Sequence, residues 1–388
     1  MSYWRLLIIV ILVLYCPLFV LADEFRLVPS IAVKEEYNSN ILLSTYDVKS
    51  DFLTTISPGI EMVDRTDRLD TDLLVRLDRL EYADNRDFSS TNQTYNGKLR
   101  YLITPLFSVS AEAGYVRNSN PTLNIETTGI AMAAIPWDHF TSSLSTDYKI
   151  TEKTVAAVSY TYGRDYFERT GYVDDISHDV NVGFVHDLGQ YLPAVKGRIN
   201  GDYSYYYFAN TRIDSVSGTV GFTCQLNEFW NVLVDGGVRH TWSDFSLAQF
   251  QLENSGWGWV GKVSLNYNGE YGNGVLSYLR DLTPAYGLGG AAEQNALTLS
   301  TQYRVTHELS ILLSAGYYTL KSDPTEFSPQ VINQRTFHIN PGVRYEFSKD
   351  VNVEASYEYT MVDYPAVNTE ANRNLFTIRL YIQHPFLE

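Results

Sequence analysis

The sequence has little of what several large protein classes require. Only two of its 388 residues are cysteine, and charged residues make up 19%. Beyond residues 1–22 it has no second apolar run of the roughly 18 residues that a spanning helix needs. The mean hydropathy of −0.18 is too low for a bundle of membrane-spanning helices. Because Cys16 lies in the N-terminal apolar run, the rest of the chain keeps Cys224 alone, which excludes an internal disulfide.

Positive charge and chemical motifs are also scarce. The chain has 29 Lys and Arg residues against 45 Asp and Glu residues, a formal charge of −16. This excludes nucleic acid as a partner, because neutralising phosphates takes clustered Lys and Arg. The seven histidines show no His-x-x-x-His spacing, and there is no Gly-x-Ser-x-Gly motif, P-loop or cysteine pair. We therefore expect no enzyme, no catalytic residue, no metal site and no cofactor.

The N-terminus has the pattern of a secretory signal peptide. A short basic start leads into the apolar run Leu6–Leu21, and the small-residue pattern Val20-Leu21-Ala22 precedes two acidic residues. An uncleaved anchor is the alternative, but the run is shorter than the roughly 20 residues of a spanning helix and Pro17 interrupts it. We predict a signal peptide over 1–22, cleaved after Ala22, and one mature domain over 23–388.

What the sequence has in plenty is aromatic residues and alternation. Aromatics reach 14%, with 30 tyrosines. Apolar and polar residues alternate with a period of two, as where Phe376, Ile378 and Leu380 oppose Thr377 and Arg379, and this period indicates β-strands. About 18 such segments follow one another. They lie near 25–37, 51–63, 68–82, 93–103, 106–118, 138–149, 154–166, 175–187, 194–207, 212–225, 230–243, 255–268, 273–284, 295–305, 309–320, 334–347, 351–364 and 373–386.

The connections and the polar face select the architecture. Long links such as 38–50, 83–92, 119–137, 244–254 and 321–333 alternate with short ones, as expected of an up-and-down antiparallel meander. A soluble sandwich or barrel would bury the apolar face inside, but here the polar face carries mid-strand charges of both signs. We predict an all-β fold, a transmembrane barrel of about 18 strands (16–18), in a bacterial outer membrane with its lipid as partner.

A barrel of this size has a lumen wide enough for water unless loops plug it. We expect the long link 119–137 to fold inward. Residues on the polar face, and tyrosines able to stack on a solute, are predicted to line the lumen. They are Arg76, Lys98, Arg100, Glu112, Arg198, Asp202, Arg344, Glu346, Glu358, Arg379, Tyr160, Tyr162, Tyr206, Tyr278 and Tyr381.

The first hairpin resembles a known family. Its sequence Glu36-Tyr-Asn-Ser-Asn-Ile41, followed by Ser50-Asp-Phe-Leu-Thr-Thr-Ile-Ser-Pro-Gly59, is similar to the opening of bacterial outer-membrane β-barrel porin families with Tyr-x-x-Asn-Ile and Ser-Asp-Phe-x-Thr-x-x-x-Pro-Gly stretches. The match covers about 25 residues. Pro58 and Gly59 within a strand indicate a local bend or bulge. The resemblance implies an outer-membrane barrel of the kind associated with exopolysaccharide and exosortase loci, with polysaccharide export machinery as a partner and no catalytic residues.

Three functions remain open from the sequence. The barrel exports a polysaccharide or another hydrophilic polymer, or it is a general diffusion porin, or it is a structural or adhesive barrel that transports nothing. A sugar path favours aromatic faces in the lumen, a diffusion porin needs an open constriction, and a structural barrel predicts a filled lumen. Nothing in the sequence selects an oligomeric state.

Overall fold

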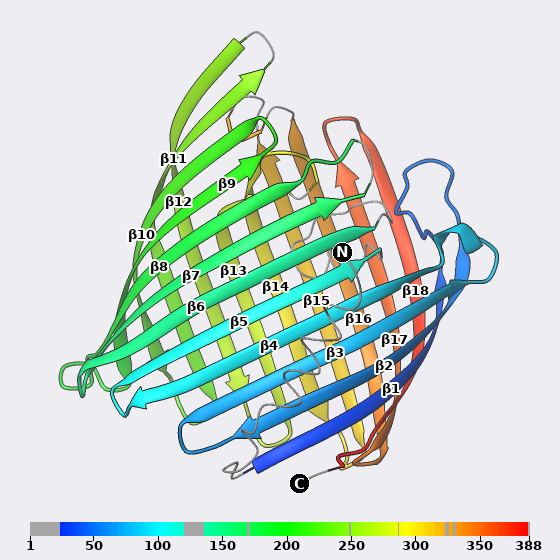
Figure 1. The fold of residues 1–388 in the computed structure, drawn as a ribbon, viewed down its shortest axis with the longest axis horizontal. Coiled ribbons are helices and arrows are strands. Elements are labelled where there is room, and N and C mark those ends of the chain that lie inside the picture. The colour runs from blue at the N-terminus through cyan, green and yellow to red at the C-terminus, as the bar shows by residue number, and fades with distance from the viewer. Residues whose placement is uncertain are drawn as a thin grey trace, which may run out of the picture.

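The protein is a single closed β-barrel (Figure 1). The computed structural model describes residues 24–119, 136–168, 171–247, 250–285, 287–322, 326–328 and 331–386. A short 3-10 helix, η1 (Arg86–Phe88), lies between β3 and β4. The strands are β1 (Glu24–Asn38), β2 (Asp51–Arg65), β3 (Leu69–Tyr82), β4 (Ser90–Thr104), β5 (Phe107–Asn118), β6 (Trp137–Thr151), β7 (Thr154–Phe167), β8 (Asp175–Asp187), β9 (Val195–Phe208), β10 (Thr211–Gln225), β11 (Trp230–Leu247), β12 (Phe250–Asn268), β13 (Gly272–Pro284), β14 (Ala291–Arg304), β15 (Leu309–Ser322), β16 (Ile332–Ser348), β17 (Val351–Tyr364) and β18 (Thr369–Gln383).

Each strand pairs antiparallel with the next along the chain, and the ring closes between its first and last strands. Ser30–Asn38 of β1 pair with Leu375–Gln383 of β18. The 18 strands form one sheet, and its first and last strands are paired with each other. The predicted all-β, up-and-down antiparallel barrel of 18 strands is confirmed. Closure pairs the backbone groups of β1 and β18, which would otherwise be exposed edges, and a sheet in lipid requires such pairing.

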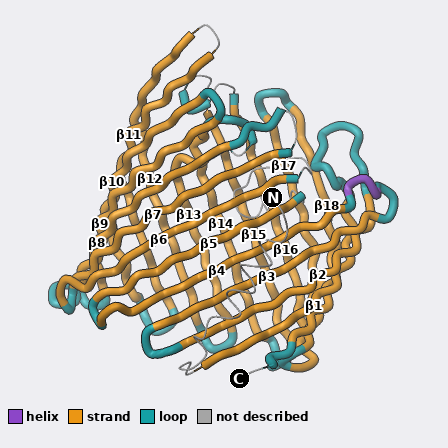
Figure 2. The backbone as a smooth tube through the Cα atoms, in the orientation of Figure 1, coloured by secondary structure: helices purple, strands orange, loops and turns teal. Residues whose placement is uncertain are grey.

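The two ends of the barrel differ in their connections (Figure 2). We call the end that carries the connections 39–50, 83–89, 119–136, 168–174, 285–290 and 323–331 the loop end. The opposite end is the turn end, and most of its connections are shorter: 66–68, 105–106, 152–153, 188–194, 226–229, 269–271, 305–308 and 349–350. The start of β1 and the finish of β18 both lie at the turn end. In outer-membrane barrels the short turns face the periplasm and the longer loops face outward.

Two expectations about local structure are wrong. Residues 244–254 are not a long link, because β11 and β12 run on as a paired hairpin to Leu247 and Phe250, which projects beyond the rest of the barrel in Figure 1. Pro58 causes no bulge, because the β2–β3 register is the same at Ile56 and at Gly59. Instead the ladder to β3 is interrupted at Ser57 and Pro58, as expected for a residue that has no N–H to donate.

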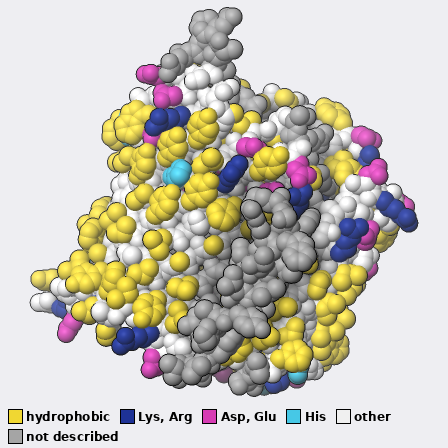
Figure 3. All heavy atoms as spheres, viewed as in Figure 1, with side chains coloured by type: hydrophobic (Ala, Val, Ile, Leu, Met, Phe, Trp, Pro, Cys, Tyr) yellow, Lys and Arg dark blue, Asp and Glu magenta, His cyan; other side chains and the backbone are white. Residues whose placement is uncertain are grey.

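The outer face is apolar and the inner face polar. On β18, Phe376 and Ile378 are more than half exposed on the outside, and Thr377 and Arg379 between them line the interior. Figure 3 shows one side of this outer surface, which is predominantly hydrophobic where the residues are described. An apolar surface that faces away from the protein is stable only against lipid or a partner. No helix among the described residues is long and apolar enough to span a membrane.

Candidate functional site: the lumen

The structure places most of the predicted lumen residues on the inner face. This face is identified by side chains that meet across the barrel and by the cavities that several strands line together. Alternation along each strand and the register with its neighbours then assign the rest. The inner-face residues are Arg76, Lys98, Arg100, Glu112, Arg198, Asp202, Tyr206, Arg344, Glu346, Glu358, Arg379 and Tyr381.

Three predicted lumen tyrosines point outward instead. Tyr160 and Tyr162 share the outer face of β7 with exposed Val158, and Tyr278 is paired with exposed Leu297. The expectation that these three line the lumen is therefore wrong. A tyrosine suits either face of a membrane strand, since its ring is apolar and its hydroxyl is polar, so its identity alone does not assign its side. Its place in the alternation does.

A large cavity lies along the inner wall formed by β1–β5 and β16–β18. It has a volume of about 590 Å³ and is lined by charged and hydroxyl side chains from these strands. Opposite charges sit side by side on this wall. Glu354 accepts hydrogen bonds from Arg344 at 2.8 Å and from Arg379 at 3.2 Å, and Arg76 lies 3.1 Å from Asp78. The wall therefore offers many hydrogen-bonding groups but a nearly neutral field.

One ion pair in this wall is fully buried. The guanidinium of Arg373 on β18 donates to the carboxylate of Glu358 on β17, and neither side chain is more than 3% exposed. Thr360 also donates to Glu358, at 2.7 Å. A buried charge must keep its partner, because losing one leaves the other uncompensated. This pair fixes the register of the two last strands beside the cavity.

The tip of the β13–β14 hairpin, residues 281–292, inserts into the loop end of the lumen and narrows it. One face of the tip, with Ala292, packs in a cluster with Trp137 of β6 and Tyr318 of β15. The other face, with Leu282 and Ala291, packs in a second cluster with Phe208 of β9. Because both faces are covered by inner-face residues of different walls, the tip lies inside the barrel mouth. The backbone N–H of Val173 also donates to the carbonyl of Gly287, at 3.0 Å, which ties loop 168–174 to the tip.

Small residues make this insertion possible. Ala285, Ala291 and Ala292 are completely buried. Gly290 has φ +122°, and a Cβ there would lie 2.6 Å from the carbonyl oxygen of Phe327. Only glycine tolerates this backbone conformation and this approach. Sequence reasoning missed the tip because a Gly- and Ala-rich stretch has the composition of an exposed turn, although the lack of charge over residues 282–292 was a usable signal.

Residues of the first-hairpin motif organise the loop end. Asn40 is buried, and its amide donates to the carbonyl oxygens of Ser44 at 3.0 Å and Asn372 at 3.1 Å. Ile41 packs next to it in an apolar cluster with Leu53 and other inner-face residues. The motif is therefore structural: it folds loop 39–50 back onto the rim of the lumen.

The link expected to fold inward lies mostly outside the described residues, which omit 120–135. Its inward course stays a prediction. The predicted signal peptide, residues 1–22, also lies outside the described residues, which begin at Glu24. Within the described ranges, no group of three or more His, Cys, Asp or Glu side chains is placed to hold a metal ion.

Comparisons with known proteins give likenesses of architecture. No protein-family model matches the chain, and no curated protein matches it. Among solved structures, OccAB3 of Acinetobacter baumannii is 10% identical, with 94% of this chain and 100% of that chain covered and a TM-score of 0.48. OccAB4 of the same organism is 8% identical, with 94% and 99% covered and a TM-score of 0.49. OpdQ of Pseudomonas aeruginosa is 8% identical, with 94% and 100% covered and a TM-score of 0.49.

The localisation follows from the chain's own structure. The barrel is closed, antiparallel throughout and built of an even number of strands. Its outer face is apolar, and its interior holds ion pairs and a polar cavity. These are the properties of barrels that span the bacterial outer membrane. The chain is an outer-membrane β-barrel whose polar lumen is narrowed at the loop end by one of its own hairpins.

Proposed function

We propose that this barrel is a channel for hydrophilic solutes across the outer membrane. The polar cavity of about 590 Å³ inside the closed wall carries the proposal. A barrel that served only as a scaffold would gain stability from apolar packing in its interior, whereas this wall keeps unfilled space beside charged and hydroxyl groups. Such a lining replaces part of the hydration shell of a passing solute.

The arrangement of charges favours solutes that are polar but uncharged. Lys98 on β4 lies 3.3 Å from Glu112 on β5, and Arg198 on β9 lies 3.1 Å from Asp235 on β11. Each cation is thus neutralised by a neighbour on the same wall rather than by a charge across the lumen. A transverse field that sorts ions would need the two signs on opposite walls.

Export of a polysaccharide is the finer form of this proposal. It rests on the resemblance of the first hairpin and on Tyr381, which lines the inner face, whereas Tyr206 is buried in the apolar cluster around the tip and offers no face to a sugar. With Tyr160, Tyr162 and Tyr278 on the outer face, the aromatic part of such a path is shorter than expected. A sugar path through this barrel would depend mainly on hydrogen bonds from the charged wall.

A barrel that transports nothing is the second possibility, and the inserted β13–β14 tip favours it. If the tip stays in place, it narrows the lumen between β6–β7 and β14–β16. Transport then requires the rest of the mouth to remain open or the tip to move.

Conductance of the refolded protein in a planar bilayer separates these possibilities. We expect a steady current with weak ion selectivity that added maltodextrins block in a concentration-dependent way. A current that is indifferent to sugars would leave a general porin. No current from barrels shown to be folded by their heat-modifiable migration on gels would contradict the channel and leave the structural barrel.

A further inference from the structure

The barrel wall has one seam where neighbouring strands separate. β12 and β13 pair only from Gly261–Asn268 with Asn273–Arg280. Toward the loop end, β13 continues from Asp281 to Pro284 and pairs only with β14. On the same side of the paired part, β12 extends from Val260 back to Phe250 and pairs only with β11. Among the described residues, therefore, Phe250–Val260 and Asp281–Pro284 face a wedge in the wall with no backbone ladder across it.

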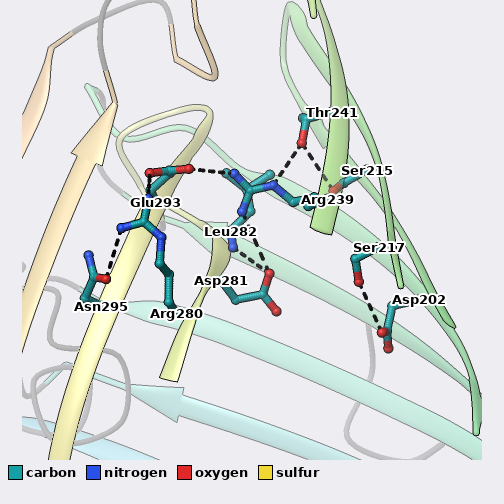
Figure 4. Close-up of polar contacts among 10 residues, drawn as sticks. All are labelled: Asp202, Ser215, Ser217, Arg239, Thr241, Arg280, Asp281, Leu282, Glu293 and Asn295. Atoms are coloured by element: carbon teal, nitrogen blue, oxygen red, sulfur yellow. Dashed lines mark hydrogen bonds and ion pairs between the residues drawn. The ribbon is translucent and has the colours of Figure 1, made fainter. Parts of the chain in front are cut away.

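Side chains close this seam in place of the backbone. The guanidinium of Arg239 on β11, which is 2% exposed, donates to Glu293 of β14 at 2.9 Å. Glu293 also accepts from Arg280 at 2.6 Å, so that one carboxylate joins two arginines across the wedge (Figure 4). On β12 between them stands Gly258, where a Cβ would lie 2.7 Å from the Arg239 Nη2 atom. We call Arg239, Glu293 and Arg280 the latch.

A polar latch is an unusual way to close a membrane wall. Apolar side chains packed into the wedge would close it without any charged partner, whereas a buried ion pair can open only where another polar group or water takes the place of the lost partner. The latch is also not fully satisfied. Among the described residues, Nη1 of Arg239 donates no hydrogen bond and lies 3.9 Å from the carboxylate of Asp281.

Directly inside the seam lies an acidic cavity of about 250 Å³. It is bounded by Asp281 and Leu282, from the part of β13 that does not pair with β12, and by Asp202 of β9 and Ser217 of β10. The Ser217 hydroxyl donates to Asp202 at 3.2 Å. Asp179 is the third carboxylate, and no lysine or arginine lines the cavity. Glu293 offsets only one of the two arginine charges of the latch, and Arg239 lies 3.9 Å from Asp281, but the three carboxylates of the cavity still outnumber this single positive charge. The cavity therefore attracts a positively charged group.

The seam opens near the outer boundary of the membrane. The paired part spans eight residues, Gly261–Asn268, which is about 26 Å of strand at roughly 3.3 Å per residue. At a strand tilt of about 40°, the paired part rises about 20 Å along the barrel axis from the turn end. The apolar belt of such barrels is about 25 Å tall, so the pairing ends near its outer boundary. Trp257 and Trp259 beside the wedge are more than half exposed, as suits side chains at the lipid–water boundary.

We propose that the β12–β13 seam is a lateral port between the lumen and the outer leaflet, used by amphiphiles whose head carries an amine. The β13–β14 tip narrows the mouth beside it, so the route through the wall bypasses the narrowed part of the loop end. The amine head occupies the acidic cavity and the apolar tail extends through the wedge into lipid. The latch holds the port shut when no ligand is bound.

The test uses a photoreactive analogue of dodecylamine added to proteoliposomes, with the labelled residues mapped by mass spectrometry. Cys224→Ser with Val260→Cys and Asp281→Cys places a cysteine pair at the first unpaired positions of the seam. We expect label on inner-face residues of β9 and β10 in the wild type, weaker label in the reduced variant, which has lost the Asp281 carboxylate, and no label there once the disulfide forms. Arg239→Gln, which breaks the latch, leaves Glu293 paired with Arg280 and keeps Asp281, is expected to raise that label several-fold.

The controls isolate the seam and the charge. Leu265→Cys with Leu276→Cys cross-links the paired part of the same strands. In this control, the label on inner-face residues of β9 and β10 must be equal in the oxidised and reduced forms. Photoreactive dodecanoic acid, with the same tail and the opposite charge, is expected to label the outer face alone. Label confined to the outer face of folded wild-type barrels, or inner label unaffected by the seam disulfide, would overturn the port. This readout needs no ion current and so is independent of the proposed channel.

Discussion

At the scale of single residues, Asp51 shows how the first-hairpin motif acts. Its buried carboxylate accepts hydrogen bonds from the backbone N–H groups of Asn85 at 2.7 Å and Asp84 at 3.1 Å, and from the Asn85 amide at 2.9 Å. One side chain at the start of β2 thus holds the loop between β3 and β4. Hydrogen bonds to a charged acceptor are stronger than those to a neutral one.

Asp51→Asn is therefore expected to lower the free energy of unfolding by about 1–3 kcal/mol, because an amide offers one acceptor and no charge. Urea titration of the refolded barrel in detergent measures this. Asp67→Asn on the exposed turn 66–68 is the matched control, and equal stability of the two variants would show that the Asp51 contacts contribute nothing.

At the scale of elements, the strands could be predicted and the inserted tip could not. Alternation located the strands because each strand presents one face to lipid and one to water, so that apolar and polar residues alternate along it. It failed at 244–254, where β11 and β12 extend beyond the membrane and no longer need an apolar face. The assignment of Tyr160, Tyr162 and Tyr278 to the lumen is wrong for another reason: it followed residue type, whereas their place in the alternation puts them on the outer face.

The tip gives a prediction at this scale. Gly290→Ala places a Cβ against the Phe327 carbonyl in a backbone conformation that other residues avoid, a strain of about 1–3 kcal/mol. We expect the tip to loosen from the mouth and the single-channel conductance to rise. Gly218→Ala, where nothing lies within 4 Å of the new Cβ, should leave conductance unchanged. A Gly290→Ala barrel with wild-type conductance would mean that the tip does not limit the current.

At the scale of the whole molecule, the lumen wall is a mosaic of paired charges, and the sequence alone did not reveal the pairing. The charged residues could be assigned to the inner face from alternation, but their partners depend on register between strands. Glu354 forms ion pairs with two arginines from the neighbouring strands. Glu354→Gln leaves Arg344 and Arg379 uncompensated beside this large cavity.

We expect this variant to shift the reversal potential in a KCl gradient toward chloride selectivity, and the shift should shrink at high salt because of screening. Glu152→Gln on the exposed turn between β6 and β7 is the control. A reversal potential equal to that of the control would show that ions do not pass along this wall.

The pairing of β1 with β18 has a consequence for assembly. Every other ladder in the described sheet joins strands that follow one another along the chain, whereas this one joins Ser30–Asn38 to Leu375–Gln383. Hairpins can therefore form one after another as the chain becomes available, but the ring closes only when its most distant segments meet, which is the slowest kind of contact to make. Until that moment β1 and β18 are bare edges able to pair with any other strand. The time spent in this open form sets how long the nascent barrel needs protection from other chains.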